Sequence, residues 1–464
     1  MLNLTLLFLG LSLYVASSFQ WNQAQDNAVQ QKMLQDKHDV NIVHYQPEQV
    51  HLSFGETVLD IVVTWNTRNN TNDSICEYGI DAIDEHIAKS PQGPNKFVDG
   101  GAQKATQYIH RVTLAQLQAN TTYRYHCGSQ LGWSAIYWFR TTFNHSNWSP
   151  SLAIYGDMGV VNAASLPALQ RETQLGKYDA ILHVGDFAYD MCHENGEVGN
   201  EFMRQVETIA AYVPYMVCVG NHEEKYNFSH YTNRFSMPGG NDNLFYSFDL
   251  GPVHFIGFST EVYYFTQFGL KPIVMQYDWL ERDLIEASKP ENRAKRPWII
   301  TFGHRPMYCS NNNGDDCAKH ETVVRKGLPG LNFFGLEPLF YKYGVDVELW
   351  AHEHCYERMW PMYNYTVYNG SLAEPYVNPG APVHIISGAA GNQEGREPFF
   401  KKMPPWSAFH SQDYGYLRLK AHNATHLYFE QVSDDKGGKV IDNFWVIKHT
   451  HGPYKDSHKA FHEL

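Results

Sequence analysis

Basic residues are scarce in this chain of 464 residues. It has 36 Lys and Arg against 49 Asp and Glu, which leaves a formal net charge of -13 at pH 7. Affinity for a nucleic-acid backbone comes from clustered Lys and Arg, so this balance argues against a nucleic-acid partner. An anionic substrate would need positive charge from another source, and a bound metal ion can supply it.

Long hydrophobic runs are missing after the first 18 residues, so we expect no membrane span in the mature chain. Residues 1–18 hold a short apolar run that ends in Ala16-Ser17-Ser18, a pattern typical of a signal peptide. A membrane anchor would need about 18 apolar residues, and this run is shorter. We therefore expect entry into the secretory pathway, with the extracellular space and the lysosome both open as destinations.

Cysteine is also scarce, and the count of seven is odd, so at least one thiol is free or pairs with another chain. The bridges considered are Cys76 with Cys127 and Cys309 with Cys317. Secretion is indicated independently by nine N-x-Ser/Thr triplets, at which N-glycans are expected. These lie at Asn69, Asn72, Asn120, Asn144, Asn147, Asn227, Asn364, Asn369 and Asn423.

Internal repeats and low-complexity tracts are absent, and the chain is long enough for two or three cores. Residues 40–145 contain short alternating apolar runs separated by Gly, Asn and Asp, which predicts a β-sandwich. From residue 150 onward, short apolar runs alternate with longer amphipathic stretches, which predicts buried strands in an α/β layer architecture. Further strand-like runs over residues 382–448 are expected to complete a sheet of that second domain.

Five polar clusters each follow an apolar run of the second domain. Carboxyl ends of neighbouring strands open onto one crevice in α/β folds, so these clusters can form one site. Their carboxylate, amide, imidazole and phenol groups suit iron, zinc or manganese rather than copper(I) or an iron–sulfur cluster. The clusters are Gly156-Asp157-Met158-Gly159, Gly185-Asp186-Phe187-Ala188-Tyr189, Gly220-Asn221-His222-Glu223, Gly303-His304-Arg305 and Ala351-His352-Glu353-His354.

Two features of these clusters favour a two-metal site. His352 and His354 alternate, so on an extended strand end they would share one face and reach different ions. Two ions about 3.5–4 Å apart need a bridging carboxylate, and Asp186 in the central cluster is the natural candidate.

At these motifs the chain resembles the purple acid phosphatases, in the larger plant-like form that also occurs in animals. The resemblance implies a fibronectin III-like N-terminal sandwich (40–145), an α/β calcineurin-like metallophosphoesterase domain centred on a four-layer β-sandwich (150–395), and a C-terminal family segment (382–448). It implies Fe(III) held by Asp157, Asp186, Tyr189 and His354, and Fe(II), Zn or Mn held by Asp186, Asn221, His304 and His352. It also implies that His222 contacts the phosphate and helps to protonate the leaving group.

The first cluster separates this family from the wider calcineurin-like phosphoesterases, which place a His two residues after the first Asp. Here that residue is Gly159, and the resemblance implies that Tyr189 replaces the missing ligand. Ala351 stands where the family usually has Gly, a change that is costly if its φ is positive. A further substrate-contacting His of the family has its nearest candidate in His320.

The expected activity is therefore hydrolysis of small phosphate monoesters by hydroxide that two metal ions activate. Two alternatives remain at this point. One is a phosphodiesterase or nucleotide hydrolase on the same metal core, and the other is a secreted binding protein that keeps an inert phosphatase fold. The sequence leaves the oligomeric state open.

Overall fold

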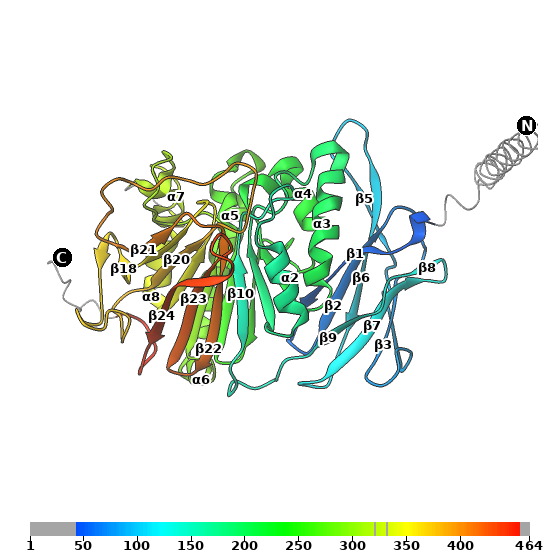
Figure 1. The fold of residues 1–464 in the computed structure, drawn as a ribbon, viewed down its shortest axis with the longest axis horizontal. Coiled ribbons are helices and arrows are strands. Elements are labelled where there is room, and N and C mark those ends of the chain that lie inside the picture. The colour runs from blue at the N-terminus through cyan, green and yellow to red at the C-terminus, as the bar shows by residue number, and fades with distance from the viewer. Residues whose placement is uncertain (1–42, 320–321, 331–332, 455–464) are drawn as a thin grey trace, which may run out of the picture.

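The computed structural model describes residues 43–319, 322–330 and 333–454, so the predicted signal peptide lies outside the described residues. The N-terminal part is a sandwich of two antiparallel sheets, at the right of Figure 1. One sheet has the order β1 (Glu48–Phe54), β2 (Ile61–Thr67), β6 (Thr106–Leu114), β5 (Asn95–Val98). The other has the order β4 (His86–Lys89), β3 (Ile75–Gly79), β7 (Thr122–Ser129), β8 (Gly132–Trp133), with β9 (Tyr137–Arg140) paired to β7.

The second part is built on two mixed sheets. The six-stranded sheet has the order β12 (Tyr215–Cys218), β11 (Ala180–Val184), β10 (Ser151–Tyr155), β22 (Gly415–Asn423), β23 (His426–Ser433), β24 (Lys439–Ile447). The seven-stranded sheet has the order β13 (Phe245–Leu250), β14 (Val253–Phe258), β15 (Trp298–Phe302), β16 (Val347–Trp350), β20 (Val383–Ser387), β17 (Tyr356–Met359), β21 (Ser407–Ser411). A small hairpin, β18 (Met362–Tyr363) and β19 (Thr366–Val367), lies outside both sheets.

The predicted apolar runs form the centres of these sheets. Strands β10, β11 and β12 are parallel, and so are β14, β15, β16 and β20. Their residues are almost all buried because both faces of each sheet are covered. The C-terminal strand β22 pairs antiparallel with β10, so the end of the chain completes the sheet as expected.

Helices cover the outer faces of the two sheets and connect their parallel strands. The α-helices are α2 (Leu166–Gln174), α3 (Glu197–Ala210), α4 (Lys225–Arg234), α5 (Lys271–Ala287), α6 (Pro290–Lys295), α7 (Val323–Lys326) and α8 (Leu336–Tyr343). The 3-10 turns are η2 (His193–Gly196), η3 (Asn221–Glu223), η4 (Glu261–Tyr263), η5 (Thr266–Phe268) and η6 (Asp316–Ala318). Helix α3 lies between the six-stranded sheet and the N-terminal sandwich (Figure 1).

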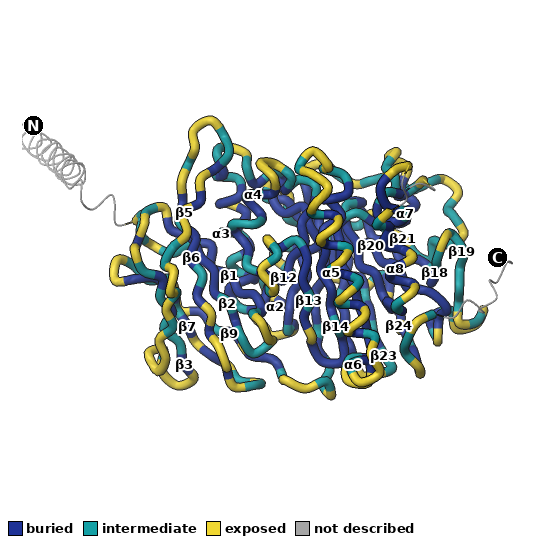
Figure 2. The backbone as a smooth tube through the Cα atoms, turned by 180° about the vertical axis from the view of Figure 1, so that it is seen from behind, coloured by how far each residue is buried: buried dark blue, intermediate teal, exposed yellow. Residues whose placement is uncertain are grey.

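Buried polar contacts join the sandwich to the second part. The backbone N–H of Val50 donates to Glu207 of α3 at 3.0 Å, and the Tyr125 hydroxyl donates to the carbonyl of Ala211 at 2.7 Å. Arg234, which is buried, donates to Gln49 of β1 at 3.1 Å. The buried backbone in Figure 2 continues across this junction, so the sandwich packs against the second part.

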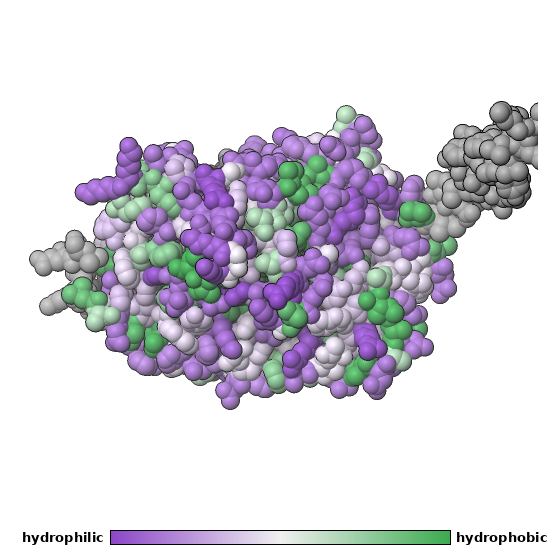
Figure 3. Space-filling model, viewed as in Figure 1, coloured by the Kyte–Doolittle hydropathy of each residue, from purple (hydrophilic) through white to green (hydrophobic). Residues whose placement is uncertain are grey.

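The outer surface is mainly hydrophilic on the face that Figure 3 shows, with apolar residues scattered in small groups. Among the described residues, none of the helices combines the length and apolar character that crossing a bilayer requires.

Of the two bridges considered from sequence, one is present. Cys309 and Cys317 form a disulfide, which confirms that expectation. Cys76 and Cys127 face each other in register on β3 and β7, but both are free thiols, so the second expectation is wrong for this structure. Facing positions alone do not make a bridge, because a disulfide also requires both sulfurs to point at one another with a Cβ–S–S–Cβ dihedral of about 90°.

Candidate metal centre

The five polar clusters lie at the carboxyl ends of parallel strands, as the sequence predicts. Asp157 follows β10 and Asp186 follows β11, and both are fully buried. Both also have left-handed backbones, with φ +57° and +51°. Each strand therefore turns sharply at its aspartate, and the two carboxylates enter the same crevice.

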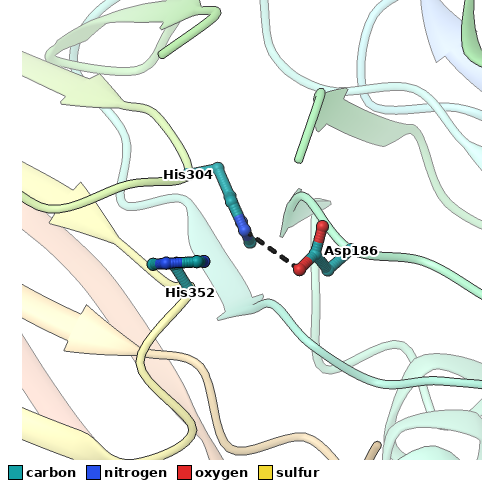
Figure 4. A group of neighbouring side chains, drawn as sticks. All are labelled: Asp186, His304 and His352. Atoms are coloured by element: carbon teal, nitrogen blue, oxygen red, sulfur yellow. Dashed lines mark ion pairs between the residues drawn. The ribbon is translucent and has the colours of Figure 1, made fainter. Parts of the chain in front are cut away.

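One half of the site is formed around Asp186. Its Oδ2 lies 3.1 Å from Nε2 of His304, and the same Nε2 lies 3.2 Å from Oδ1 of Asn221. Figure 4 shows His304 pointing toward Asp186, with His352 beside it. Ligand atoms of Asp186, His304 and His352 all lie within 4.8 Å of one another, so these groups can hold one cation.

The other half of the site is formed around Tyr189. Its hydroxyl donates to Oδ1 of Asp157 at 3.1 Å and lies 3.0 Å from Nε2 of His354. Nε2 of His354 is 3.6 Å from the same Asp157 oxygen. A phenol, a carboxylate and an imidazole thus converge beside the first group. The structure therefore brings together all seven ligands predicted from sequence.

The His-x-His segment differs from its expected conformation. Strand β16 ends at Trp350, and His352 has a left-handed φ of +68°, so the prediction that the strand end is extended here is wrong. The chain bends there because the backbone N–H of His352 donates to Oδ2 of Asp157 at 2.9 Å. Ala351 does not have a positive φ, which explains why alanine is tolerated at that position.

Gly159 occupies a position where a side chain would be strained and crowded. Its φ is +71°, and an added Cβ would lie 3.0 Å from Cα of Asn392 and 3.5 Å from Cδ2 of Tyr189. A histidine at this position would need both a strained backbone and the space that the Tyr189 ring already fills. The absence of a side chain at Gly159 therefore leaves the space that the Tyr189 ring occupies.

Burial and neighbouring charges shift the pKa values of the acidic groups in the site. Burial, together with the neighbouring Asp186, raises the pKa of Asp157 well above its usual value. Burial and the carboxylate of Asp157 likewise raise the pKa of the Tyr189 phenol. Burial opposes ionisation of Asp186 too, but His304 and His222 hold its pKa below the usual range. A cation among these groups would favour the ionised forms of Asp157 and Tyr189.

The imidazole orientations also fit metal binding. Nδ1 of His304 lies 2.8 Å from the carbonyl of Val184, and Nδ1 of His354 lies 3.1 Å from the carbonyl of Gly395. A carbonyl can only accept, so both Nδ1 atoms carry hydrogen and both Nε2 atoms face the site, where a metal ion can replace any proton that they hold. The residues present therefore fit a two-metal centre.

Two further residues shape the site and were given no role from sequence. Glu223 is fully buried and accepts backbone N–H groups from Gly220 at 2.9 Å and from Asp186 and Phe187 at 3.0 Å each, so it connects two of the metal-site loops. The sequence signal that could have identified Glu223 was its place directly after His222 in the third cluster. Asp190 follows Tyr189 directly, but nothing local to the sequence marks its partner.

The partner of Asp190 is His222. Nδ1 of His222 lies 2.7 Å from Oδ1 of Asp190, and Nε2 lies 3.9 Å from Oδ2 of Asp186. Burial lowers the pKa of His222, but Asp186 and Asp190 outweigh it and raise the pKa to about 9. His222 thus borders the crevice and presents Nε2 to it. His320, the other residue considered for substrate contact, lies outside the described residues.

Comparisons with known proteins address the family directly. Residues 47–141 match the family model "Purple acid Phosphatase, N-terminal domain", residues 150–356 match "Calcineurin-like phosphoesterase", and residues 381–443 match "Iron/zinc purple acid phosphatase-like protein C". The chain is 54% identical over 411 residues to acid phosphatase type 7 of Danio rerio, covering 88% of this chain and 93% of that protein. The chain belongs to the purple acid phosphatase family.

Two further similarities agree with this membership in the purple acid phosphatases. Acid phosphatase type 7 of Homo sapiens is 53% identical over 402 residues, covering 87% of this chain and 91% of that protein. The solved structure of the purple acid phosphatase PPD1 from yellow lupin (Lupinus luteus) seeds superposes with a TM-score of 0.71 at 25% identity, over 87% of this chain and 75% of that one. The predicted fold class, a β-sandwich followed by a metallophosphoesterase domain, is confirmed.

Proposed function

We propose that this purple acid phosphatase family member is an acid phosphatase that hydrolyses small phosphate monoesters at a centre of Fe(III) and a divalent ion. The observation that carries the proposal is the position of the Tyr189 hydroxyl, within 3.1 Å of Asp157 and 3.0 Å of His354. A phenolate is a strong ligand for Fe(III), and Gly159 leaves room for it. The words "iron/zinc" in the description of the matched C-terminal family model support the same metals.

The ligands divide between the two ions according to their positions. Asp157, Tyr189 and His354 would hold Fe(III), and Asn221, His304 and His352 would hold Fe(II), Zn or Mn, with Asp186 shared between them. When bound, the ions would supply positive charge for the phosphate and lower the pKa of water. The short distances from His304 to Asp186 and to Asn221 support a common position for the second set.

His222 supplies the proton chemistry in this proposal. Asp190 accepts a hydrogen bond from Nδ1 and so orients the imidazole, and Nε2 faces the crevice. A proton held at Nε2 can pass to the oxygen of the departing alcohol, which leaves as a neutral molecule. Glu223 keeps the loops of Asp186 and Asn221 together, so it acts through positioning.

The direct test combines metal analysis with kinetics of the purified full-length protein. We expect one iron and one divalent ion per chain, and faster turnover of an aryl phosphate monoester than of the matching diester. Asp186→Ala should abolish turnover, whereas Asp60→Ala, a change far away in the sandwich, should leave it intact. Full activity in the Asp186 variant would refute the proposal, and a preference for the diester would favour a phosphodiesterase.

We also propose that the protein enters the secretory pathway and carries N-glycans, with the lysosome and the extracellular space as its destinations. Most of the sequon asparagines are exposed, which supports access for glycosylation, whereas Asn69 and Asn369 are half-buried. Glycopeptide mass spectrometry after expression in a eukaryotic secretory host is the test, and unmodified protein retained in the cytosol would overturn this proposal. The exposed asparagines are Asn72, Asn120, Asn144, Asn147, Asn227, Asn364 and Asn423.

A further inference from the structure

The loop closed by the Cys309–Cys317 disulfide brings an acidic residue to one of the metal-site histidines. Oδ2 of Asp315 lies 2.6 Å from Nε2 of His352, and the two side chains are 26% and 14% exposed. Oδ1 of Asp315 already accepts the backbone N–H of Asp316 at 2.7 Å. One carboxylate oxygen therefore holds the loop, and the other is left for the imidazole.

A second group competes for the same imidazole nitrogen. Nη1 of Arg305 lies 2.9 Å from Nε2 of His352. A guanidinium can only donate, whereas an ionised carboxylate can only accept, so the two neighbours demand opposite protonation of Nε2. If Nε2 accepts from Arg305, the ring proton sits on Nδ1 and neither nitrogen has a lone pair for a metal. If Nε2 donates to Asp315, Nδ1 keeps its lone pair.

Arg305 has other partners that restrain it. Its Nε donates to Glu261 at 3.0 Å, and its guanidinium lies 4.5 Å from the centre of the Tyr264 ring. Nη1 of Arg305 is 3.7 Å from Oδ2 of Asp315, so its charge favours the ionised carboxylate. Arg305 thereby keeps Asp315 as an acceptor, and Asp315 decides which nitrogen of His352 carries the proton.

The loop is anchored well enough to act in this way. Asn313 donates to Oε2 of the buried Glu353 at 2.8 Å and accepts the backbone N–H of Asp315 at 3.1 Å. On the far side, the Tyr264 hydroxyl donates to Asp316 at 2.8 Å. Together with the disulfide, these contacts fix Asp315 on both sides, and its carboxylate has a defined position.

We propose that Asp315 is a positioning residue that selects the His352 tautomer able to hold the divalent ion. This inference rests on the proposed function, because it assumes that His352 is a ligand of that ion. A carboxylate on the outer nitrogen of a ligating imidazole orients the ring, and its loss typically weakens metal binding by about 10–100-fold. Loss of Asp315 should weaken binding of the divalent ion and leave iron binding unchanged, because Asp315 contacts none of the other predicted ligands that the structure describes.

The test is zinc titration of the full-length iron-loaded protein against a competing chelator, with Asp315→Ala and Asp315→Asn. We expect about 10–100-fold weaker zinc affinity for Asp315→Ala and a smaller loss for Asp315→Asn, whose amide oxygen can still accept. Iron content and the visible absorption band should not change. In the metal-free protein, ¹⁵N NMR should show the proton of His352 moving from Nε2 to Nδ1 in Asp315→Ala, with His352→Gln identifying the signal.

Asp316→Asn is the matched control, because it changes the neighbouring carboxylate of the same loop, which contacts Tyr264 instead of His352. Zinc affinity within twofold of wild type in Asp315→Ala, equal loss of iron and zinc, or an equal effect of Asp316→Asn would each overturn the inference. If Asp315→Ala fails to fold, Asp315→Asn decides by the same criteria. Wild-type protein without iron or monoesterase activity would instead refute the proposed function.

Discussion

The hydroxyl oxygen of Tyr189 lies 3.0 Å from Nε2 of His354, although 165 residues separate the two in the chain. The phenol follows β11 and the imidazole follows β16, so the contact exists because two sheets present their carboxyl ends to one crevice. This pair, with Asp157, defines the position where Fe(III) is proposed to bind.

Replacement of Tyr189 by Phe should remove the visible absorption band of the iron protein, because the band requires a phenolate bound to Fe(III). Loss of a contact to the outer nitrogen of a ligand typically lowers metal affinity or activity by about 10–100-fold. Loss of a direct ligand should therefore lower the iron affinity by at least about 100-fold. Absorption spectra with iron quantification measure this. Tyr155→Phe, which changes a buried phenol paired with Tyr215, is the control and should keep the band. A band that survives in Tyr189→Phe would assign it to another group.

Replacement of Gly159 by Ala should destabilise the metal-free protein more than the same change at Gly176. Both glycines have nearly equal φ, +71° and +73°, so both pay about 1–2 kcal/mol for a left-handed alanine. A Cβ at residue 159 would also lie 3.0 Å from Cα of Asn392, whereas Gly176 has nothing within 4 Å. We expect an additional cost of about 1 kcal/mol at residue 159 from urea unfolding. Equal losses of unfolding free energy at the two positions would show that the protein relaxes and relieves the contact between the added Cβ and Asn392.

Replacement of His254 by Gln should cost more stability at pH 5.5 than at pH 10. His254 lies between Asp249 at 2.7 Å and Asp283 at 2.9 Å, and Arg296 also contacts Asp249. Burial lowers its pKa, but the hydrogen bonds to the two carboxylates outweigh this and raise the pKa to about 9. The raised pKa stabilises the fold fully below the unfolded value of 6.5, and this stabilisation is lost as the pH rises through 9.

The measurement is urea unfolding of wild type and variant at both pH values. The difference in unfolding free energy between the two proteins should be larger at pH 5.5 by about 2–3 kcal/mol, since each pKa unit corresponds to about 1.4 kcal/mol. A difference that is independent of pH would show that the pKa of His254 is the same in the folded and the unfolded protein.

Thiol labelling of the denatured, unreduced protein should modify the five cysteines that the structure leaves free, while Cys309 and Cys317 react after reduction. Peptide mass spectrometry identifies the labelled positions. A peptide that links Cys76 to Cys127 would contradict the structure at that pair and restore the sequence-based expectation. The five free positions are Cys76, Cys127, Cys192, Cys218 and Cys355.

The strands and the order of the site motifs were predictable from local patterns. Apolar runs such as 180–184 and 298–302 are buried strands because a short run of that kind is stable in water only between covering layers. The polar clusters follow these runs directly, and a chain that leaves a buried strand must reach the edge of its sheet. Asp157, Asp186, Asn221 and His304 could be placed near one another on that basis.

Only the tertiary structure shows the contacts between segments that no local sequence pattern connects. Asp315 reaches His352 across 37 residues, and Arg305 competes for the same nitrogen, because a disulfide loop folds back over the crevice. Cys76 and Cys127 lie opposite each other on their strands, yet both are free thiols.

The sequence by itself therefore determined the fold class, because hydrophobic periodicity is a property of short segments, and its five motifs carried the resemblance that implied the family and the seven candidate ligands. The tertiary structure decided the left-handed turn at His352, the carbonyls that hold the Nδ1 protons of His304 and His354, and the carboxylates behind His222 and His352. The physical reason is that proton positions depend on the nearest acceptor in space, and that acceptor comes from whichever loop the packing of the sheets brings close.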